Sequence, residues 1–177
     1  MQTYATLTPI DAPKGCAVAL GYFDGVHCGH RAVMAAAVPY AAAQGCNPGG
    51  FTFSLPEGFV QQVLVQCLHA KAVFCGDNFT FGARAIGNVT LLRALCAKHG
   101  ITVEIVPMAQ YGGQVVSSTR IRAALEEGRV EDANAMLGAP YAIDWAVTHG
   151  KGVGSTKLGT PTMNQNYPAG TLQPCCG

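Results

Sequence analysis

The sequence has little charge. Asp, Glu, Lys and Arg make up only 12% of its 177 residues, about half of the roughly 25% that is usual in globular proteins. Eleven basic and ten acidic residues leave a net charge of +1, so no strong overall field attracts nucleic acid or an anionic membrane. Any anion that the chain binds must therefore be held by local geometry. Since 49% of the residues are hydrophobic, the composition excludes a disordered, charged protein and favours one domain, with or without an extension.

The sequence also lacks a long apolar run. Its most apolar stretch, residues 32–43, is far shorter than the ~20 residues that a membrane-spanning helix needs. The first residues have neither the basic nor the apolar region of a signal peptide. The eight cysteines include no C-x-x-C pair, the spacing typical of zinc ribbons and thioredoxin-like centres. We therefore expect a cytoplasmic protein whose cysteines are reduced and are mostly small core residues.

Three common motifs for phosphate binding and nucleophilic catalysis are missing. There is no G-x-x-x-x-G-K-[ST] loop, and no G-x-G-x-x-G follows the first expected strand. No G-x-S-x-G turn occurs either. The sequence therefore gives no support to a P-loop NTPase or to a dinucleotide-dependent oxidoreductase.

What the sequence does contain is an alternation of short apolar runs with helical patterns. Strands are expected at residues 17–20, 51–53, 72–75 and 101–106, and helices at residues 29–44, 59–69, 88–99 and 117–128, with a short one ending near 138. Apolar strands separated by helices of this length indicate βαβ units with right-handed crossovers. We therefore predict an α/β fold with a Rossmann-like parallel sheet and helices on both faces.

The pattern changes after Pro140. One strand is expected at residues 141–147, and glycine and proline are frequent in the remaining residues. Such a segment has too little apolar surface to fold alone. We therefore divide the chain into a domain at residues 1–140 and a second segment at residues 141–177.

Residues 21–30, Gly-Tyr-Phe-Asp-Gly-Val-His-Cys-Gly-His, lead from the first expected strand into the first helix. Ligands of open α/β sheets lie at the carboxyl ends of the strands, and the amino terminus of a helix attracts anions. His27 and His30 would add directed donors to a phosphate chain, and Gly29 permits a close approach of the backbone. Two alternatives stay open. The histidines could belong to an ordinary turn, or they could bind a metal together with Cys28, although no further Cys/His cluster completes four ligands.

A second basic helix start lies at residues 117–122, Ser-Ser-Thr-Arg-Ile-Arg. Its hydroxyl residues are typical helix caps. Its two arginines oppose the helix dipole, at a cost of about 0.3–1 kcal/mol each when exposed. A bound polyphosphate would reverse the sign of that interaction, and His30 and Arg31 repeat the pattern at the first helix. The sequence therefore favours one joint phosphate site over coincidence.

These motifs resemble those of a known family. Residues 27–30 are similar to the H-x-G-H motif of nucleotidylyltransferases, and residues 117–122 to their S-S-T-x-x-R element. Three further segments narrow the resemblance to the bacterial bifunctional riboflavin kinase/FAD synthetase family: residues 21–27, 76–82 and 137–141. Residues 159–164, Gly-Thr-Pro-Thr-Met-Asn, resemble the motif that opens that family's kinase module. The resemblance implies a nucleotidylyltransferase domain at residues 1–140, followed by the start of a β-barrel riboflavin kinase module.

The family implies transfer of AMP from ATP to FMN, which yields FAD and pyrophosphate, with Mg²⁺ on the phosphates. Such a transfer depends on positioning and charge stabilisation more than on covalent help. Motif positions imply that the catalytic residues are His27, His30 and Arg122, that the ATP-binding residues are Gly21, Phe23, Asp24, Gly29, Ser117, Ser118 and Thr119, and that the residues near FMN are Asn78, Phe81 and Arg84. Phe81 could equally be an ordinary core residue.

Two departures from the family pattern bear on activity. The family has a further strand and helix after its second strand, whereas here residues 51–55 run directly into 56–60. The first domain is therefore shortened near residues 54–58, and part of the wall on the flavin side is expected to be missing. The chain also ends soon after Thr162 and Asn164, the metal ligands implied by the kinase motif. We therefore expect no riboflavin kinase activity.

The leading hypothesis is an FMN adenylyltransferase whose partners are the small molecules ATP and FMN, with no nucleic acid or membrane. One alternative is a catalytically silent ATP-binding fragment. Another is an adenylyltransferase that uses the same ATP residues with a different phosphorylated acceptor.

Overall fold

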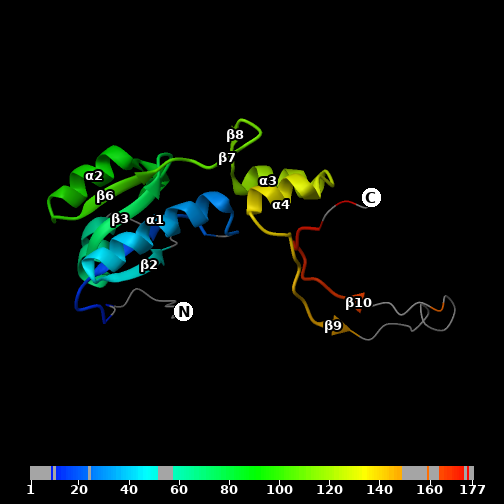
Figure 1. The fold of residues 1–177 in the computed structure, drawn as a ribbon, viewed down its shortest axis with the longest axis horizontal. Coiled ribbons are helices and arrows are strands. Elements are labelled where there is room, and N and C mark those ends of the chain that lie inside the picture. The colour runs from blue at the N-terminus through cyan, green and yellow to red at the C-terminus, as the bar shows by residue number, and fades with distance from the viewer. Residues whose placement is uncertain are drawn as a thin grey trace. The chain divides into compact units, whose positions relative to one another are not determined.

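The first half of the chain is built on one parallel sheet. The computed structural model describes residues 9, 11–23, 25–51, 58–148, 159, 164–173 and 175, and the chain forms two compact units, residues 1–118 and 119–177. The first unit contains a four-stranded parallel sheet in the order β2-β1-β3-β6 (Figure 1). Its strands are β1 (Cys16–Leu20), β2 (Asn47–Phe51), β3 (Ala70–Gly76) and β6 (Thr102–Val106).

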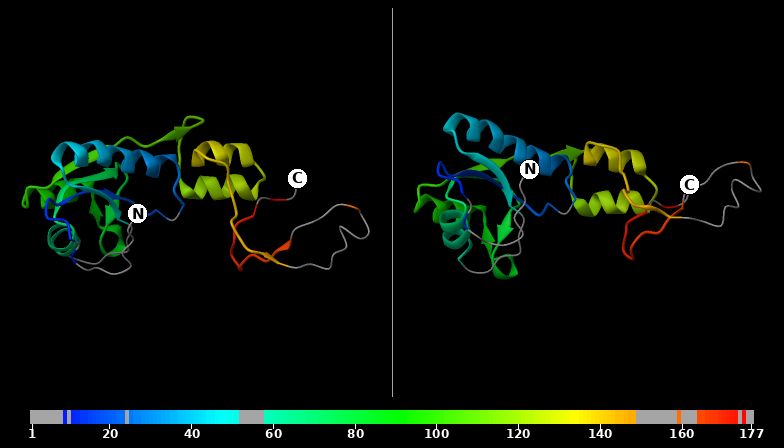
Figure 2. Two further views of the ribbon diagram at one scale, coloured as in Figure 1. Left: turned by 60° about the horizontal axis from the view of Figure 1, so that its bottom comes forward. Right: turned by 90° about the horizontal axis from the view of Figure 1, so that it is seen from below.

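Helices cover both faces of this sheet. Helix α1 (Cys28–Gln44) packs its buried residues against Ala17, Ala19 and Phe74 on one face. The wide, π-helical η1 (Val60–Cys67) and α2 (Val89–Ala97) cover the other face. Figure 2 shows α1 and η1 on opposite sides of the sheet. The predicted Rossmann-like α/β arrangement of a parallel sheet flanked by helices is confirmed.

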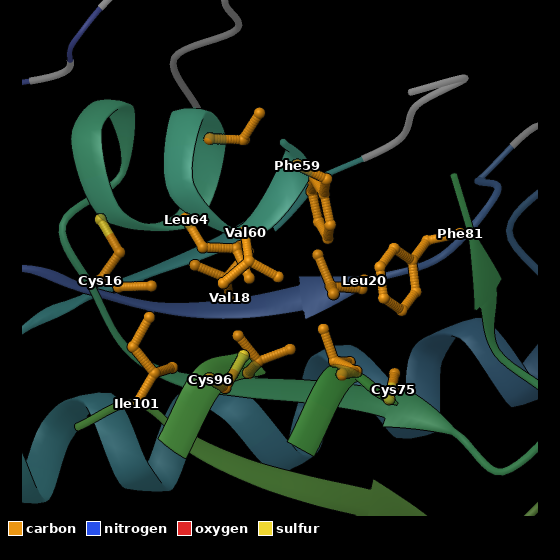
Figure 3. Packing of buried hydrophobic residues seen from close by; sticks show 14 of the residues in the cluster. Cys16, Val18, Leu20, Phe59, Val60, Leu64, Cys75, Phe81, Cys96 and Ile101 are labelled. Carbon is orange, nitrogen blue, oxygen red and sulfur yellow. The ribbon is translucent and has the colours of Figure 1, made fainter. Parts of the chain in front are cut away.

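The larger of the two cores lies under η1 and α2. Val18 and Leu20 of β1 point toward this side, because alternate residues of a strand face opposite sides of the sheet. Figure 3 shows them between Leu64 of η1 and Cys96 of α2. All five residues of β1 are buried, as expected for a strand that is covered on both faces.

Helix α1 continues through Pro39 to Gln44 and ends at Gly45, which adopts the left-handed conformation (φ 61°). A proline inside a helix costs about 3 kcal/mol, since it removes one hydrogen bond and clashes with the preceding turn. Ala37 and Ala41, on either side of Pro39, are both almost completely buried against the sheet. Tertiary packing therefore offsets the intrinsic cost of the proline.

The expected strand at residues 51–53 was placed wrongly. The observed β2 covers Asn47–Phe51 and includes the Pro-Gly-Gly sequence that the prediction assigned to a turn, while residues 52 and 53 lie outside the described part of the chain. Among the described residues β2 pairs with β1 and forms an edge of the sheet. Proline is tolerated at an edge, because the strand needs hydrogen bonds on one side alone.

The second unit contains helices α3 (Ser118–Glu126) and α4 (Val130–Leu137). The expected strand at residues 141–147 is mostly absent: β9 (Val147–Thr148) pairs with β10 (Asn164–Gln165) over two residues each. The Tyr141 N–H instead donates to Asn134 Oδ1 at 2.6 Å, and its hydroxyl donates to the Leu172 carbonyl at 2.6 Å. These side-chain bonds replace a strand ladder at that position. The predicted domain boundary at residue 140 stays a prediction.

Four of the described cysteines are buried, namely Cys16, Cys46, Cys75 and Cys96. Burial raises the pKa of the Cys75 and Cys96 thiols to about 11, and it also raises that of Cys16. These thiols therefore act as small apolar side chains at neutral pH. Among the helices of the described residues, none is long and apolar enough to cross a membrane.

Two adjacent leucines of α2 test this packing. Leu92 is completely buried, whereas Leu91 is 42% exposed. We expect Leu92→Ala to lower the free energy of unfolding by about 2–5 kcal/mol, because it removes apolar contacts and leaves a cavity. Leu91→Ala, in the same helix, is expected to change it by less than about 1 kcal/mol. Urea denaturation of both variants measures the difference, and equal losses would contradict the assigned core.

Candidate functional site

A cleft of about 380 Å³ opens at the carboxyl ends of β1, β3 and β6. The chain leaves β1 through α1 toward β2 on one side, and it leaves β3 through α2 toward β6 on the other. The connections therefore diverge between β1 and β3, and open α/β sheets bind their ligands at such a switch point. The cleft lies within the first unit.

Two stacked histidine rings stand at the amino terminus of α1. His27 is the N-cap residue: its Nδ1 accepts the His30 backbone N–H at 3.4 Å, and its side chain is almost completely buried. The rings of His27 and His30 are stacked with centroids 3.8 Å apart and planes 17° apart. His30 Nδ1 also lies 3.3 Å from the Gly25 carbonyl oxygen. The structure therefore brings both predicted histidines to one wall of the cleft.

Two glycines make room for these rings. A Cβ on Gly29 would lie 3.1 Å from two atoms of the His27 ring, which is tighter than ordinary van der Waals contact. A Cβ on Gly21, directly after β1, would lie 2.7 Å from Phe23 Cε1. The Phe23 ring in turn meets His30 edge to face at 5.2 Å. Small residues are thus required here by side-chain packing.

A hairpin brings the serines to the cleft. β7 (Gln110–Tyr111) and β8 (Gln114–Val115) are joined by Gly112 and Gly113, both with positive φ, as a tight hairpin turn requires. The Val116 N–H donates to the Ala109 carbonyl at 2.8 Å and closes the base of the hairpin. The chain then reaches Ser117 and Ser118, which line the cleft.

The structure does not place all of the other predicted ATP and metal ligands at the cleft. Thr119 and Arg122 are exposed residues of α3 and belong to the second unit, so their part in this cleft stays a prediction. Asp24 and Thr162 lie outside the described residues. The backbone of Asn164 forms part of β10, paired with Thr148.

The residues predicted near FMN lie in three different environments. Asn78 lines the cleft. Phe81, in β4 (Thr80–Phe81), is buried in the larger core, with its ring 5.8 Å from Phe59 and 6.1 Å from Phe79. Arg84 is exposed and has a left-handed backbone (φ 55°). Phe79 contributes to the cleft lining, whereas Phe81 and Arg84 do not.

Several cleft residues were not among the predicted site residues, although the first, third and fourth of them lie in the motif segments 21–27 and 76–82: Tyr22, Val33, Phe79, Thr80, Val106, Pro107 and Met108. The last three follow directly from the end of β6. Their position after an expected parallel strand is a signal that could have identified them, since ligands lie at the carboxyl ends of such strands.

The metal-binding alternative for His27, Cys28 and His30 finds no support. In the part of the chain that the structure describes, no group of three or more His, Cys, Asp or Glu side chains could hold a metal ion. The stacking of the two imidazoles also differs from the convergence of ring nitrogens on one point that a metal needs.

Comparison with known proteins connects this cleft to one family. A sequence model of the family described as FAD synthetase matches residues 10–57 and 51–120, which together make up more than half of the chain. The two matched segments overlap at residues 51–57, in the stretch where the sequence predicts a shortened domain.

Several curated relatives bear the name bifunctional riboflavin kinase/FMN adenylyltransferase. The one from Haemophilus influenzae is 30% identical over 197 positions, covering 85% of this chain and 64% of the relative. Those from Listeria monocytogenes (30%, 83% and 61%) and Escherichia coli K12 (27%, 85% and 63%) are similar. The chain thus spans less than two thirds of the length of these relatives. In the first alignment 197 positions cover 85% of 177 residues, or about 150, so part of the relative has no counterpart here.

A solved structure shares the fold. The crystal structure of a macrolide-efflux protein from Streptococcus pneumoniae matches with a TM-score of 0.68 and 25% identity, over 91% of this chain and 69% of that one.

The glycine at the start of α1 provides a test of the histidine stack. We expect Gly29→Ala to displace the His27 ring, because the new Cβ would lie 3.1 Å from it. Gly49→Ala, in β2, is the control, since no atom lies within 4 Å of a Cβ there. Ring signals in ¹H–¹³C NMR spectra should shift for His27 and His30 in Gly29→Ala only. Unchanged ring signals in that variant would contradict the stacked arrangement.

Proposed function

Because this chain belongs to the FAD synthetase family, we propose that it transfers AMP from ATP to FMN, forming FAD and releasing pyrophosphate. The observation that carries this proposal is the convergence of family motif residues, far apart in the sequence, on one cleft. The residues that line it include Gly21, His27, Gly29, His30, Asn78, Ser117 and Ser118. The cleft lies where α/β folds bind nucleotides.

The amino terminus of α1 is proposed to hold the triphosphate. The positive dipole end of a helix attracts anions, and the first turn of α1 contains no acidic residue that would repel them. The imidazoles of His27 and His30 would donate hydrogen bonds to phosphate oxygens from the same end. Ser117 and Ser118, which also line the cleft, would donate as well, and Thr119 and Arg122 are proposed to assist them at the β- and γ-phosphates. A net charge of +1 is enough for such a site, because the positive groups are local.

The reaction needs an in-line displacement at the α-phosphorus. An oxygen of the FMN phosphate forms the new P–O bond, while the bond to the bridging oxygen of the β-phosphate breaks and pyrophosphate leaves with the electron pair. Negative charge grows on the leaving group, and the two histidines and Arg122 are proposed to stabilise it. Mg²⁺ is proposed to bind to the ATP phosphates, as the family resemblance implies.

The flavin side is the shortened side. Asn78 is proposed to contact FMN from the cleft wall, and Phe81 and Arg84 to shape the flavin site from the β4 region. Two observations support the proposed loss of a strand and helix near residues 54–58. The two family matches overlap at residues 51–57. The alignment with the Haemophilus influenzae relative also contains positions that have no counterpart in this chain. Loss of that strand and helix would remove part of the wall that binds FMN. A catalytically silent ATP-binding protein is therefore the second candidate.

The assay that tests the proposal combines purified protein with ATP, FMN and Mg²⁺ and detects FAD by chromatography. We expect His30→Ala to lower kcat by about 10²-fold or more, as loss of a charge-stabilising donor does in other enzymes. His99→Ala is the control, because His99 is exposed and does not line the cleft. Equal FAD formation by His30→Ala and wild type would overturn the site. ATP binding by calorimetry without any FAD would favour the silent protein.

A further inference from the structure

Gly76 and Met108 line the cleft but have no part in the site proposed above. Gly76 is the last residue of β3, and its register partner on β6 is Val106, two residues before Met108. A Cβ on Gly76 would lie 3.0 Å from Met108 Sδ and 3.2 Å from Asn78 Oδ1. The Met108 thioether and the Asn78 amide therefore lie against the Gly76 backbone. They occupy space that the side chain of any larger residue at position 76 would need.

This pair lies next to the proposed phosphate end of the cleft. A Cβ on Gly29, in the first turn of α1, would lie 3.8 Å from the Cβ of Ala109, the residue after Met108. The Ala109 carbonyl accepts the Val116 N–H, which places Met108 close in the chain to the hairpin that leads to Ser117. A ligand with its phosphates at Gly29 and Ser117 therefore has Met108 within its reach.

The surroundings of Met108 suit a flat ring with a polar edge. Val106 and Pro107 precede it in the cleft wall, and Phe79 adds an aromatic surface. A thioether makes favourable contacts with aromatic rings, with the sulfur ~5 Å from the ring. The Asn78 side chain offers both a donor and an acceptor to the edge of a ring. Met108 itself is half-buried, so one side of it stays open to the cleft.

We propose that Met108, lying over Gly76, is a specificity-determining residue whose thioether forms the platform for the heteroaromatic ring of a substrate. This inference rests on the proposed function, which supplies two such rings, the adenine of ATP and the isoalloxazine of FMN. A substrate with the same phosphates but without a flat ring would lose this contact and bind more weakly.

The test measures the binding of each substrate separately, without turnover, to the intact chain. ATP binding is followed by calorimetry in the absence of FMN, and FMN binding by quenching of flavin fluorescence in the absence of ATP. Met108→Ala is expected to raise the Kd of one of the two ligands about 2- to 10-fold, the range that a sulfur–ring contact implies. Met108→Leu retains volume and apolar character but lacks the sulfur, so it is expected to raise the Kd of the same ligand less than Met108→Ala does.

Met34→Ala is the matched control, because Met34 is half-buried in α1 against the other core and does not line the cleft. It is expected to change neither Kd. Thermal unfolding of each variant shows whether the fold is intact. Gly76→Ala is a second variant, whose Cβ would push Met108 away, and it is expected to weaken the same ligand as Met108→Ala.

The outcomes separate the two proposals. A weaker Kd for ATP alone identifies the ring as adenine, a weaker Kd for FMN alone identifies it as isoalloxazine, and both results support the platform. If Met108→Ala and Gly76→Ala bind both ligands like wild type, the platform is wrong although FAD synthesis can still be right. If wild type binds a ligand in a Met108-dependent way but forms no FAD, only the proposed function fails. If wild type binds neither ligand, both proposals are overturned.

Discussion

The parallel pairing of β1 with β3 at the centre of the sheet is the constraint on which the rest of the structure depends. These two strands are covered by α1 on one face and by η1 and α2 on the other, and nearly all of their residues are buried. Because the connections that follow these strands leave in opposite directions, a gap lies between their carboxyl ends. The cleft, the start of α1 and the loop after β6 all meet at that gap.

The site within the cleft is made by small residues as much as by functional ones. Gly21 leaves room for Phe23, Gly29 for the His27 ring, and Gly76 for Met108. A methyl group at any of these positions would press on a side chain that lines or supports the cleft. The low overall charge makes the local geometry important as well. With 12% charged residues, anion binding depends on a few oriented donors rather than on a broad positive field.

The two sides of the cleft differ in how much of the pattern of the bifunctional relatives they retain. The side formed by β1, α1 and residues 116–118 retains the family motifs within the matched residues. The other side begins at β3 and the β4 region, where Phe81 belongs to the core and Asn78 faces the cleft. Loss of a strand and helix near residues 54–58 would affect this second side, because the chain passes from β2 at the sheet edge to η1 on the face that carries Phe59 and Phe81.

Sequence alone determined the fold class, three of the four strands of the sheet, and the histidine and serine motifs of the cleft, because apolar periodicity, caps and motif spacing are local properties. It misplaced β2, since Pro-Gly-Gly is typical of a turn and only an edge position tolerates it in a strand. It also missed the hairpin at Gly112 and Gly113, although two adjacent glycines are a turn signal. Only the tertiary structure decided that the two imidazoles stack, that Phe79 rather than Phe81 lines the cleft, and that Met108 lies against Gly76. The cleft position of Phe79 and the contact of Met108 with Gly76 depend on segments that strand order brings together, and the histidine stack depends on the space that Gly29 leaves.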